Sequence, residues 1–245
     1  MKISVVTVVR NDCAHIEETM KSVLEQSCEG FEVEYVVIDG ASEDGTAEVI
    51  RKYAPRLSYW ISEKDSGIYN AMNKGIARCT GDVIGMINSG DRYLPGALQT
   101  VADAFREYGK LDRIFWGDVI YQHQGLVRGF RKENVKRGAF APHPSMFVPR
   151  GIYERIGTYD ENFRLLGDYD FMYRAVNAEK IEPLYVPFPV AFYLEDGLSD
   201  RFVLQCLKDE LTVKLRYGQN PVTARLIFLL KVIKNLKRII KTSFR

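Results

Sequence analysis

The sequence predicts an α/β fold, with a mostly parallel sheet in the first half, a second α/β half and helices at the carboxyl end. Before residue 95, short apolar runs alternate with amphipathic helical patterns, which is typical of parallel strands joined by helices. The chain has 245 residues, enough for one large domain with a full core plus an appendage. Its 46% hydrophobic and 27% charged residues are ordinary for a globular protein.

Three general features exclude other classes of protein. The formal net charge of +2 is too small to indicate nucleic-acid binding. The four cysteines lie far apart without a C-x-x-C pair, which favours a reducing compartment over a disulfide framework or a zinc site. The apolar run at the amino terminus is too short for a signal peptide, and no run approaches the ~18 apolar residues of a spanning helix. We therefore expect a cytoplasmic or peripheral protein.

The first strand is predicted at residues 3–9, where β-branched residues suit a strand buried on both faces. A helical pattern follows at residues 16–24. No glycine stands between Met1 and Glu29, so the turn between strand and helix lacks the G-x-G-x-x-G of a dinucleotide site. This absence argues against an NAD or FAD enzyme.

The second strand, residues 31–38, runs into a turn that is rich in acids and glycines. Asp44 and Thr46 in this turn are placed to cap the helix that follows. Asp39 has no capping explanation. At the carboxyl end of a strand, its carboxylate can accept hydrogen bonds from a base or a ribose.

Two further strands are predicted at residues 57–62 and 83–87, with a helix at residues 68–77 between them. Each strand leads into a turn that carries an aspartate. Taken alone, an aspartate in such a turn is an ordinary turn or capping residue. The carboxyl ends of parallel strands meet at one edge of a sheet, however, so three acids are expected to converge on one crevice there: Asp39, Asp65 and Asp91.

Four motifs in this half resemble the successive motifs of family 2 glycosyltransferases, which have the GT-A fold. They are V-V-T-V-V-R-N, V-V-I-D-G-A-S-E-D-G-T, S-E-K-D-S-G-I-Y-N-A-M-N-K-G-I-A and M-I-N-S-G-D. The resemblance covers residues 1–195 and is closest to bacterial members that build exopolysaccharide, capsule, colanic acid or O-antigen. It implies a catalytic domain at residues 1–198, with a nucleotide-sugar-binding half-Rossmann part (1–94) and an acceptor part (95–198), followed by a helical extension at 199–245.

The resemblance also implies roles for residues that match the family's motifs. Thr7, Arg10 and Asn11 match the loop that embraces the nucleotide. Asp39 matches the acid that contacts the base, and Asp65 matches the acid of the third nucleotide-contacting turn. The implied donor is a nucleotide sugar, with a UDP-sugar favoured over a GDP- or dTDP-sugar.

Asp91 matches the last acid of the family's D-x-D motif, the ligand of a divalent cation, Mg²⁺ or Mn²⁺, that bridges the donor's diphosphate. The first acid of that motif is Ser89 here, and Gly90 stands between them. A single carboxylate, the diphosphate and waters can still hold Mg²⁺, which commonly keeps several waters. We expect a weaker site than two acids would give.

The second half starts with a helix after residues 94–96, followed by strands predicted at residues 113–121 and 126–130 and a basic stretch at 132–138. His143 stands between two prolines, which predicts a rigid extended segment. It resembles the histidine that many of these enzymes carry before the last strand of the sheet. We therefore expect His143 on the acceptor side of the site.

Gly167-Asp168 resembles the family's E-D motif at the start of a helix, with the first acid lost. Asp168 matches the general base. From the residues alone, an equally good explanation is that Asp168 caps a helix at residues 169–178, and both roles could coexist. Asp170 is interpreted as support for the start of that helix.

The carboxyl-terminal part is predicted to be helical. A turn at residues 192–199 could close over the acceptor site, and a helix is expected at 200–217. From Pro221 onward there are seven basic residues and no acid. On a helical wheel one face holds Leu226, Leu229, Leu230, Val232, Ile233, Leu236, Ile240 and Phe244, and another holds Lys231, Lys234, Arg238, Lys241 and Arg245. This pattern favours a helix in a membrane interface, on the cytoplasmic face of the inner membrane, over packing on the domain or on a second subunit.

The hypothesis from the sequence is an inverting glycosyltransferase acting on a hydroxyl of a lipid-linked glycan in surface polysaccharide synthesis. A sugar-nucleotide pyrophosphorylase would be expected to carry a glycine- and arginine-rich first loop, and this chain has no glycine there. A catalytically silent subunit that binds a partner enzyme or the membrane is the non-enzymatic alternative, supported by the missing acids at Ser89 and Gly167. The sequence leaves the sugar, the acceptor and the oligomeric state open.

Overall fold

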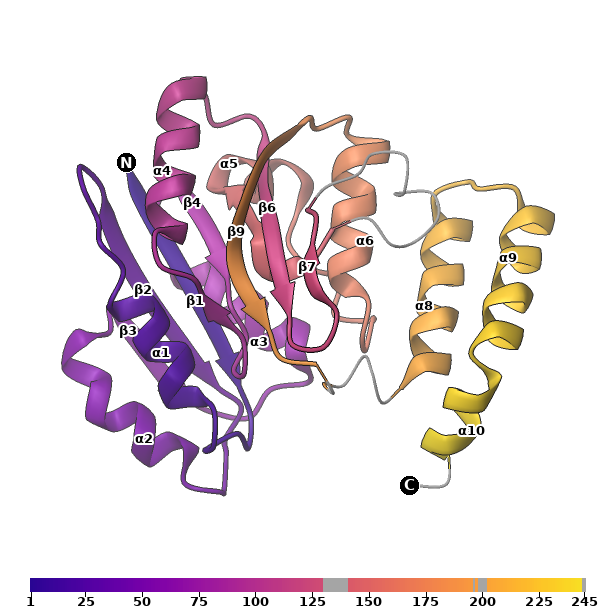
Figure 1. Ribbon diagram of the computed structural model, residues 1–245, viewed down its shortest axis with the longest axis horizontal. Helices are drawn as coiled ribbons and strands as arrows, with labels where there is room; N and C mark the ends of the chain where they lie inside the picture. The colour runs from indigo at the N-terminus through magenta and orange to yellow at the C-terminus, as the bar shows by residue number, and fades with distance from the viewer. Residues whose placement is uncertain (130–140, 196, 198–201, 244–245) are drawn as a thin grey trace.

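The computed structural model describes residues 1–129, 141–195, 197 and 202–243. In this part of the chain, helices cover both faces of one twisted sheet, and three further helices stand together at the carboxyl-terminal side (Figure 1). The strand order is β3-β2-β1-β4-β8-β6-β9-β5, with β7 paired to β6. The predicted α/β architecture is therefore confirmed.

The first half is the predicted parallel unit, in which β1 pairs with β2 and β4, and β2 pairs with β3. Each strand leads into a helix or turn at the same edge of the sheet (Figure 1). Its elements are β1 (Lys2–Val9), α1 (Ile16–Leu24), β2 (Glu32–Asp39), α2 (Thr46–Tyr53), a 3₁₀ turn (Ala54–Arg56), β3 (Tyr59–Ser62), α3 (Ile68–Arg78) and β4 (Val83–Met86).

The second half completes the sheet. β8 pairs antiparallel with β4 and β6, and β9 runs parallel to β6. Its elements are β5 (Arg92–Tyr93), α4 (Ala97–Tyr108), β6 (Ile114–Tyr121), β7 (Gly125–Val127), a 3₁₀ turn (His143–Ser145), β8 (Met146–Pro149), α5 (Arg150–Ile156), α6 (Gly167–Tyr173), a π-helical turn (Arg174–Ala178) and β9 (Pro183–Tyr193).

Strand β9 has no counterpart in the sequence prediction. It contains Pro183, Pro187 and Pro189, and proline cannot donate to a sheet ladder, so such a run does not resemble an interior strand. The structure accommodates the prolines in two ways. The pairing of β6 with β9 shifts register around Asp118, and β5 covers only a short stretch at the far end of β9.

Successive residues of a strand point to opposite faces of the sheet. The sheet therefore packs against an apolar core on each face, and these two cores hold the layers together. In β1, Val6 and Val8 contribute to the core that α3, α5 and α6 cover. Val5 and Val9 contribute to the core that α1, α2 and α4 cover. All four valines are buried, so β1 is the central support for the loops that follow the parallel strands.

A buried acid at the opposite end of the sheet ties α3 to the strands. Glu34 accepts hydrogen bonds from the backbone N–H of Thr80 at 2.7 Å and from the hydroxyls of Ser4 and Thr80 at 2.5 and 2.8 Å. The ammonium of Lys2 lies 2.9 Å from its carboxylate. Burial raises the pKa of Glu34, but these hydrogen bonds outweigh burial and lower the pKa to about 2.

We expect Glu34→Gln to lower the free energy of unfolding by about 1–3 kcal/mol at pH 7, the usual cost of disrupting a charged, buried hydrogen-bond group. The folded-state pKa of Glu34 lies below the ordinary value of 4.5, so its contribution is present above about pH 4.5 and is lost as the pH falls toward 2. Urea unfolding at pH 7 and pH 3 measures both effects. Glu48→Gln, at an exposed pair with Arg51, is the control. An equal loss for Glu34→Gln at both pH values would contradict the role of the charge.

The carboxyl-terminal helices are α8 (Val203–Arg216), α9 (Pro221–Lys234) and α10 (Leu236–Ser243). The predicted single amphipathic helix is thus wrong: the helix that Asn220 caps ends at Lys234, and a second, short helix follows. Lys231 was expected on an exposed basic face, but its ammonium lies 2.7 Å from Glu210 of α8. No helix in the described ranges is both long and apolar enough to span a bilayer.

Candidate functional site

The loop after β1 and the turn after β2 are joined by hydrogen bonds. The backbone N–H of Asn11 donates to the hydroxyl of Ser42 at 2.7 Å, and the N–H of Glu43 donates to Oδ1 of Asn11 at 2.9 Å. Asn11 has φ 51°, a left-handed conformation that asparagine tolerates better than most residues. The side chain of Asn11 therefore holds the second turn in place.

Asp39 ends β2 and is fully buried. Its carboxylate accepts hydrogen bonds from the hydroxyl and the backbone N–H of Ser42, and from the hydroxyl of Ser62 at 2.5 Å. These three donors come from its own turn and from the end of β3. A carboxylate offers about four acceptor positions, so one more donor can be accommodated.

Gly40 brings two other predicted residues to the same place. A Cβ at this position would lie 2.3 Å from Oδ2 of Asp65 and 3.3 Å from Cδ of Arg10. A side chain here would have to displace the carboxylate of Asp65, so glycine lets the turns after β1, β2 and β3 meet closely. Asp65 is fixed in addition by the backbone N–H of Gly67, which donates to its Oδ1 at 2.9 Å. The structure thus brings Arg10, Asp39 and Asp65 together.

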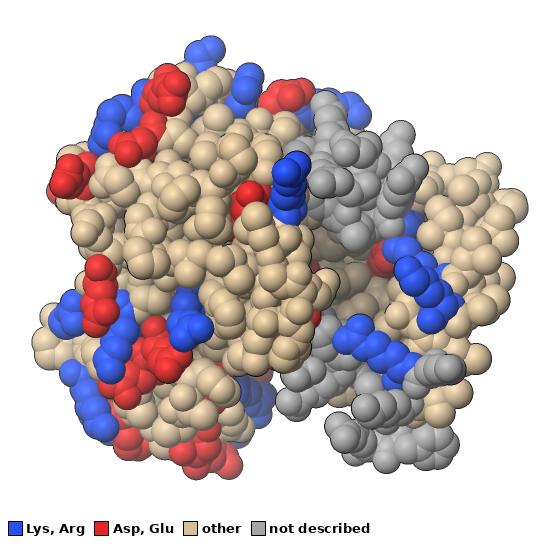
Figure 2. All heavy atoms as spheres, viewed as in Figure 1, with Lys and Arg blue, Asp and Glu red and all other residues tan. Residues whose placement is uncertain are grey.

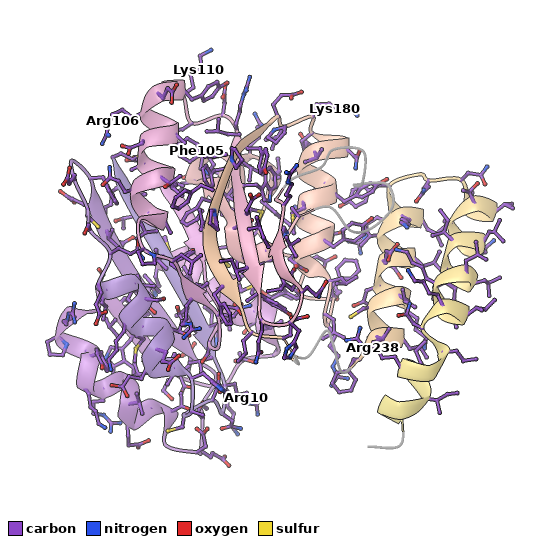
Figure 3. All side chains as sticks on the ribbon, in the orientation of Figure 1. Arg10, Phe105, Arg106, Lys110, Lys180 and Arg238 are labelled. Carbon is purple, nitrogen blue, oxygen red and sulfur yellow. The ribbon has the colours of Figure 1, made fainter. Side chains whose placement is uncertain are left out.

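Thr7 differs from its predicted partners. It lies inside β1, is fully buried, and its hydroxyl is 2.9 Å from the hydroxyl of Tyr35. Arg10 lies at the end of the sheet opposite to Lys110 and Lys180 (Figure 3). The side chain of Thr7 thus belongs to the core, whereas Arg10 and Asn11 lie in the loop at the candidate site.

The turn that carries Asp91 is held from α1. The hydroxyl of Thr19 accepts a hydrogen bond from the N–H of Gly90 at 3.1 Å and donates one to the carbonyl of Asp91 at 2.8 Å. Gly90 has φ 97°, which a side chain would strain. Sequence reasoning did not identify Thr19, because a threonine within a helix shows no sign of what its hydroxyl contacts.

Asp91 is buried, with 4% of its surface exposed. Burial raises the pKa of its carboxyl to about 8, although a hydrogen bond from the N–H of Leu194 at 2.9 Å acts in the opposite direction. That N–H is the one donor to this carboxylate in the part of the chain that the structure describes. Beside it in the turn, Oδ1 of Asn88 is buried and has no partner within the described residues.

These groups fit a hard divalent cation. A buried carboxylate, and an amide oxygen that has no partner among the described residues, are oxygen ligands of the kind that Mg²⁺ and Mn²⁺ take. Among the described residues, no three His, Cys, Asp or Glu side chains are grouped as a complete metal site. A cation here would therefore need further oxygens from a ligand such as a diphosphate, and from water.

Asp168 lies across from these turns, beside α3. The predicted capping role is wrong in detail, because α6 begins at Gly167 and Asp168 is inside its first turn. The hydroxyl of Tyr69 lies 3.0 Å from Oδ1 of Asp168 and 2.6 Å from the carbonyl of Leu165. Oδ2 of Asp168 accepts no hydrogen bond from the residues described, so this half-buried carboxylate keeps one oxygen for a ligand.

Gly167 explains the missing acid of the E-D motif. A Cβ at this position would lie 2.9 Å from the ring of Tyr69. The tyrosine that contacts Asp168 therefore fills the space that a glutamate side chain would need. Tyr69 was not identified from the sequence, since an aromatic residue at a helical spacing usually marks a core position.

His143 lies near enough to Asp168 for its charge to act on the imidazole, and it lies in a 3₁₀ turn instead of a fully extended segment. Its Nε2 is 3.1 Å from the hydroxyl of Tyr159, which is 3.2 Å from that of Tyr153. Burial lowers the pKa of His143, and the charge of Asp168 opposes this shift. The imidazole is therefore predominantly neutral at pH 7.

The segment that carries Asp168 is held from two sides. From α3, the amide of Asn73 donates to the carbonyl of Tyr159 and to Glu161, both at 2.9 Å. From α8, the guanidinium of Arg216 lies 2.7 Å from Asp160 and 3.1 Å from Asp170. Asp170 is therefore a buried partner of α8 instead of a support for the start of α6. The extension beyond residue 199 is thus part of the framework around Asp168.

Several predicted segments lie wholly or partly outside the described residues. The basic stretch at 132–138 and the end of the strand predicted at 126–130 fall outside the described residues. The turn at 192–199 is described only in part. Phe244 and Arg245 of the tail also lie outside the described part of the chain.

The sheet order, the covering helices and the acids at the carboxyl ends of the strands define a transferase fold of the GT-A type. S. aureus TarS, residues 1–349, superposes with a TM-score of 0.68 at 16% identity, over 96% of this chain and 72% of that one. The mannosyltransferase PcManGT from Pyrobaculum calidifontis, solved with GDP-Man and Mn²⁺, gives 0.62 at 14% identity, over 96% of this chain and 75% of that one. At these identities the likeness establishes the fold.

The chain belongs to glycosyl transferase family 2. Residues 4–164 match this family. An uncharacterised glycosyltransferase of Mycobacterium tuberculosis is 34% identical over 180 residues, which are 71% of this chain and 68% of the relative. A PGL/p-HBAD biosynthesis glycosyltransferase of Mycobacterium bovis is 29% identical over 222 residues, 88% of this chain and 86% of the relative. The family resemblance of the sequence motifs is confirmed, and the protein is a glycosyltransferase.

Proposed function

We propose that the protein is an inverting glycosyltransferase that moves a sugar from a nucleotide-diphosphate donor to a hydroxyl of a lipid-linked glycan during surface polysaccharide synthesis. One observation carries the proposal: the turns of Arg10, Asp39 and Asp65 meet at Gly40, and α3, which follows the last of these turns, contacts Asp168 through Tyr69. A donor held by the turns would therefore have a carboxylate within reach on another element.

Asp168 is the proposed general base. Its Oδ2 takes the proton of the acceptor hydroxyl as that oxygen attacks C1 of the sugar, on the face opposite the diphosphate. The C1–O bond to the diphosphate breaks as the new glycosidic bond forms, and inversion follows from the in-line geometry. Tyr69 holds the other carboxylate oxygen and so orients the base.

The donor is proposed to lie along the edge formed by the first three turns. Asp39 would accept a hydrogen bond from the base or ribose, and Arg10 would pair with the diphosphate. Asp91 and Asn88 would hold a divalent cation, which supplies Lewis-acid stabilisation to the leaving diphosphate. TarS structures with UDP and with UDP-GlcNAc, and the Mn²⁺-bound PcManGT, support a nucleotide sugar and a cation of this kind.

A donor screen tests the proposed activity. Nucleotide sugars with UDP, GDP and dTDP are incubated with the protein and a polyprenyl-linked glycan acceptor in Mn²⁺ or Mg²⁺, and released nucleoside diphosphate is measured. We expect acceptor-dependent release of nucleoside diphosphate from one donor class, and a UDP-sugar is the favoured donor. The absence of both release and binding of any nucleoside diphosphate would favour the silent subunit instead.

A lipid-linked acceptor also fits the exposed face of the last two helices. Large apolar side chains repeat along one stripe of α9 and continue on α10, and each is about half exposed or more: Val222, Leu226, Leu229, Ile233 and Ile240. The outer edge of α9 is correspondingly free of red and blue spheres (Figure 2). Arg225 and Lys234 are exposed nearby, and α9 and α10 contain no acid. An apolar stripe with basic neighbours suits an anionic lipid surface.

We expect the double substitution Leu226→Glu and Ile233→Glu to abolish binding to vesicles that contain anionic phospholipid. Burial of each side chain is worth about 1.5 kcal/mol or more, so the loss should be on the order of 10²-fold or greater in a co-sedimentation assay. Leu126→Glu replaces an equally exposed leucine, 58% accessible, on β7 and should bind like the wild type. A stable dimer in solution that the double substitution dissociates, with no vesicle binding, would instead identify a second subunit.

A further inference from the structure

Ser89 stands where the D-x-D motif has its first acid, and it contacts an acid on another loop. The hydroxyl of Ser89 donates a hydrogen bond of 2.6 Å to Oδ2 of Asp12, in the loop after β1. The same oxygen lies 4.0 Å from where a Cβ on Gly90 would stand. A carboxylate therefore lies directly beside the two motif positions that carry no acid.

We propose that Asp12 supplies the second negative charge of the cation and diphosphate site, in place of the acid missing at Ser89. This inference rests on the proposed nucleotide-diphosphate donor. Two observations support it beside the Ser89 contact. Asn88 Oδ1, in the same turn, is buried with no partner among the described residues. Asp91, at the end of the turn, has one donor to its carboxylate, so the turn offers ligands that the described part of the chain leaves unsatisfied.

The geometry around Asp12 leaves the carboxylate available. Its side chain is 25% exposed, so a ligand can reach it. Oδ1 is 2.6 Å from Nδ1 of His15, whose side chain is 48% exposed, and Oδ2 accepts from Ser89. Each oxygen has a second lone pair, so both contacts can persist while the carboxylate faces a cation directly or across a water.

The backbone of Asp12 explains why the acid stays in this place. Its N–H donates to the hydroxyl of Thr46 at 3.0 Å, and its carbonyl accepts from the N–H groups of His15 and Ile16 at the start of α1. These backbone hydrogen bonds fix the loop between α1 and α2 in addition to the contacts of the carboxylate. A side chain on such a fixed loop can replace a ligand from the neighbouring turn, because only its charge and position matter to the cation.

Mn²⁺ binding in the presence of saturating UDP or GDP, measured by electron paramagnetic resonance of free Mn²⁺, tests the proposal without any turnover. We expect Asp12→Asn to weaken Mn²⁺ binding about 10–100-fold, the usual range for a charged partner at a metal site. Asp12→Glu, which keeps the charge, should bind more tightly than Asp12→Asn, which keeps the shape. Ser89→Asp in the Asp12→Asn background, which returns the acid to the motif, should recover most of the affinity.

Glu48→Gln is the matched control, because Glu48 is an exposed acid of α2 that pairs with Arg51 and makes no contact with the loop of Asp12 among the described residues. It should bind Mn²⁺ like the wild type. Equal Mn²⁺ affinity of Asp12→Asn and the wild type, or tighter binding by Asp12→Asn than by Asp12→Glu, would overturn the proposal and leave the proposed function intact. A wild-type protein that binds Mn²⁺ with neither nucleotide would contradict the proposed function itself.

Discussion

Replacing Asp168 by Asn should lower turnover by at least about 10²–10⁴-fold, the usual contribution of a general base. The amide keeps the shape of the side chain and its contact with Tyr69 but cannot accept the proton of the acceptor hydroxyl. Because Asp168 lies on α6 and the donor-binding turns follow β1 to β4, donor binding should persist. Single-turnover kinetics with saturating donor, and calorimetric titration of the nucleoside diphosphate, separate the two effects.

Two further variants define the role of Asp168. Tyr69→Phe removes one orienting hydroxyl and should cause a smaller loss than Asp168→Asn, since the base itself remains. Asp103→Asn, at an exposed acid of α4, should turn over like the wild type. Normal turnover of Asp168→Asn would show that another group takes the proton.

Replacing Asp91 by Asn should remove the dependence of donor binding on a divalent cation. The amide oxygen can still accept from the N–H of Leu194, so the turn should keep its structure, but the negative charge is lost. We expect turnover to fall at least about 10²-fold, because the leaving diphosphate loses its electrostatic stabilisation. Donor titrations with Mn²⁺ and with EDTA measure the effect.

The contrast between metal and chelator gives the decisive comparison for Asp91. Wild-type protein should bind the nucleoside diphosphate more tightly with Mn²⁺ than with EDTA, whereas Asp91→Asn should bind equally weakly in both. If Asp91→Asn kept the full Mn²⁺ effect, the cation would have to be held elsewhere. Thr19→Val, which loses two hydrogen bonds to the turn, should show a partial effect in the same assay.

The sequence predicts the donor half of the site well because its geometry follows from one rule. Parallel strands place their carboxyl ends at one edge, so acids that follow β2 and β3 must lie near each other. Three acids, Asp39, Asp65 and Asp91, are expected to converge. Asp65 meets the turn of Asp39 at Gly40, whereas the convergence of Asp91 with them stays a prediction. The motifs identified the family for the same reason, since each spans a strand end and its turn.

The parts that the sequence did not reveal depend on contacts between distant residues. Ser89 and Asp12 are far apart in the chain, and so are Tyr69 and Asp168, which are separated by 99 positions. No local pattern marks such pairs. The π-helical turn after α6 and the proline-containing β9 were also missed, because both depart from the regular periodicity on which prediction depends.

The carboxyl-terminal helices show that the composition of a segment predicts its structure only in part. The lack of acids in the tail and its separate apolar and basic faces predicted an amphipathic helix. The exposed apolar stripe on α9 agrees with the apolar face of that prediction. Lys231 could not be assigned correctly, because its partner Glu210 lies on another helix. The role of α8 in holding the Asp168 segment through Arg216 is a tertiary feature for the same reason.

A structure of the protein with a nucleoside diphosphate and Mn²⁺ tests the central claim most directly. We predict that the base contacts Asp39, that the diphosphate and Mn²⁺ lie between Arg10 and Asp91, and that Asp168 faces the open end of the diphosphate where the sugar would be. A nucleotide bound at any other surface, or a diphosphate that turns away from Asp168, would contradict the account.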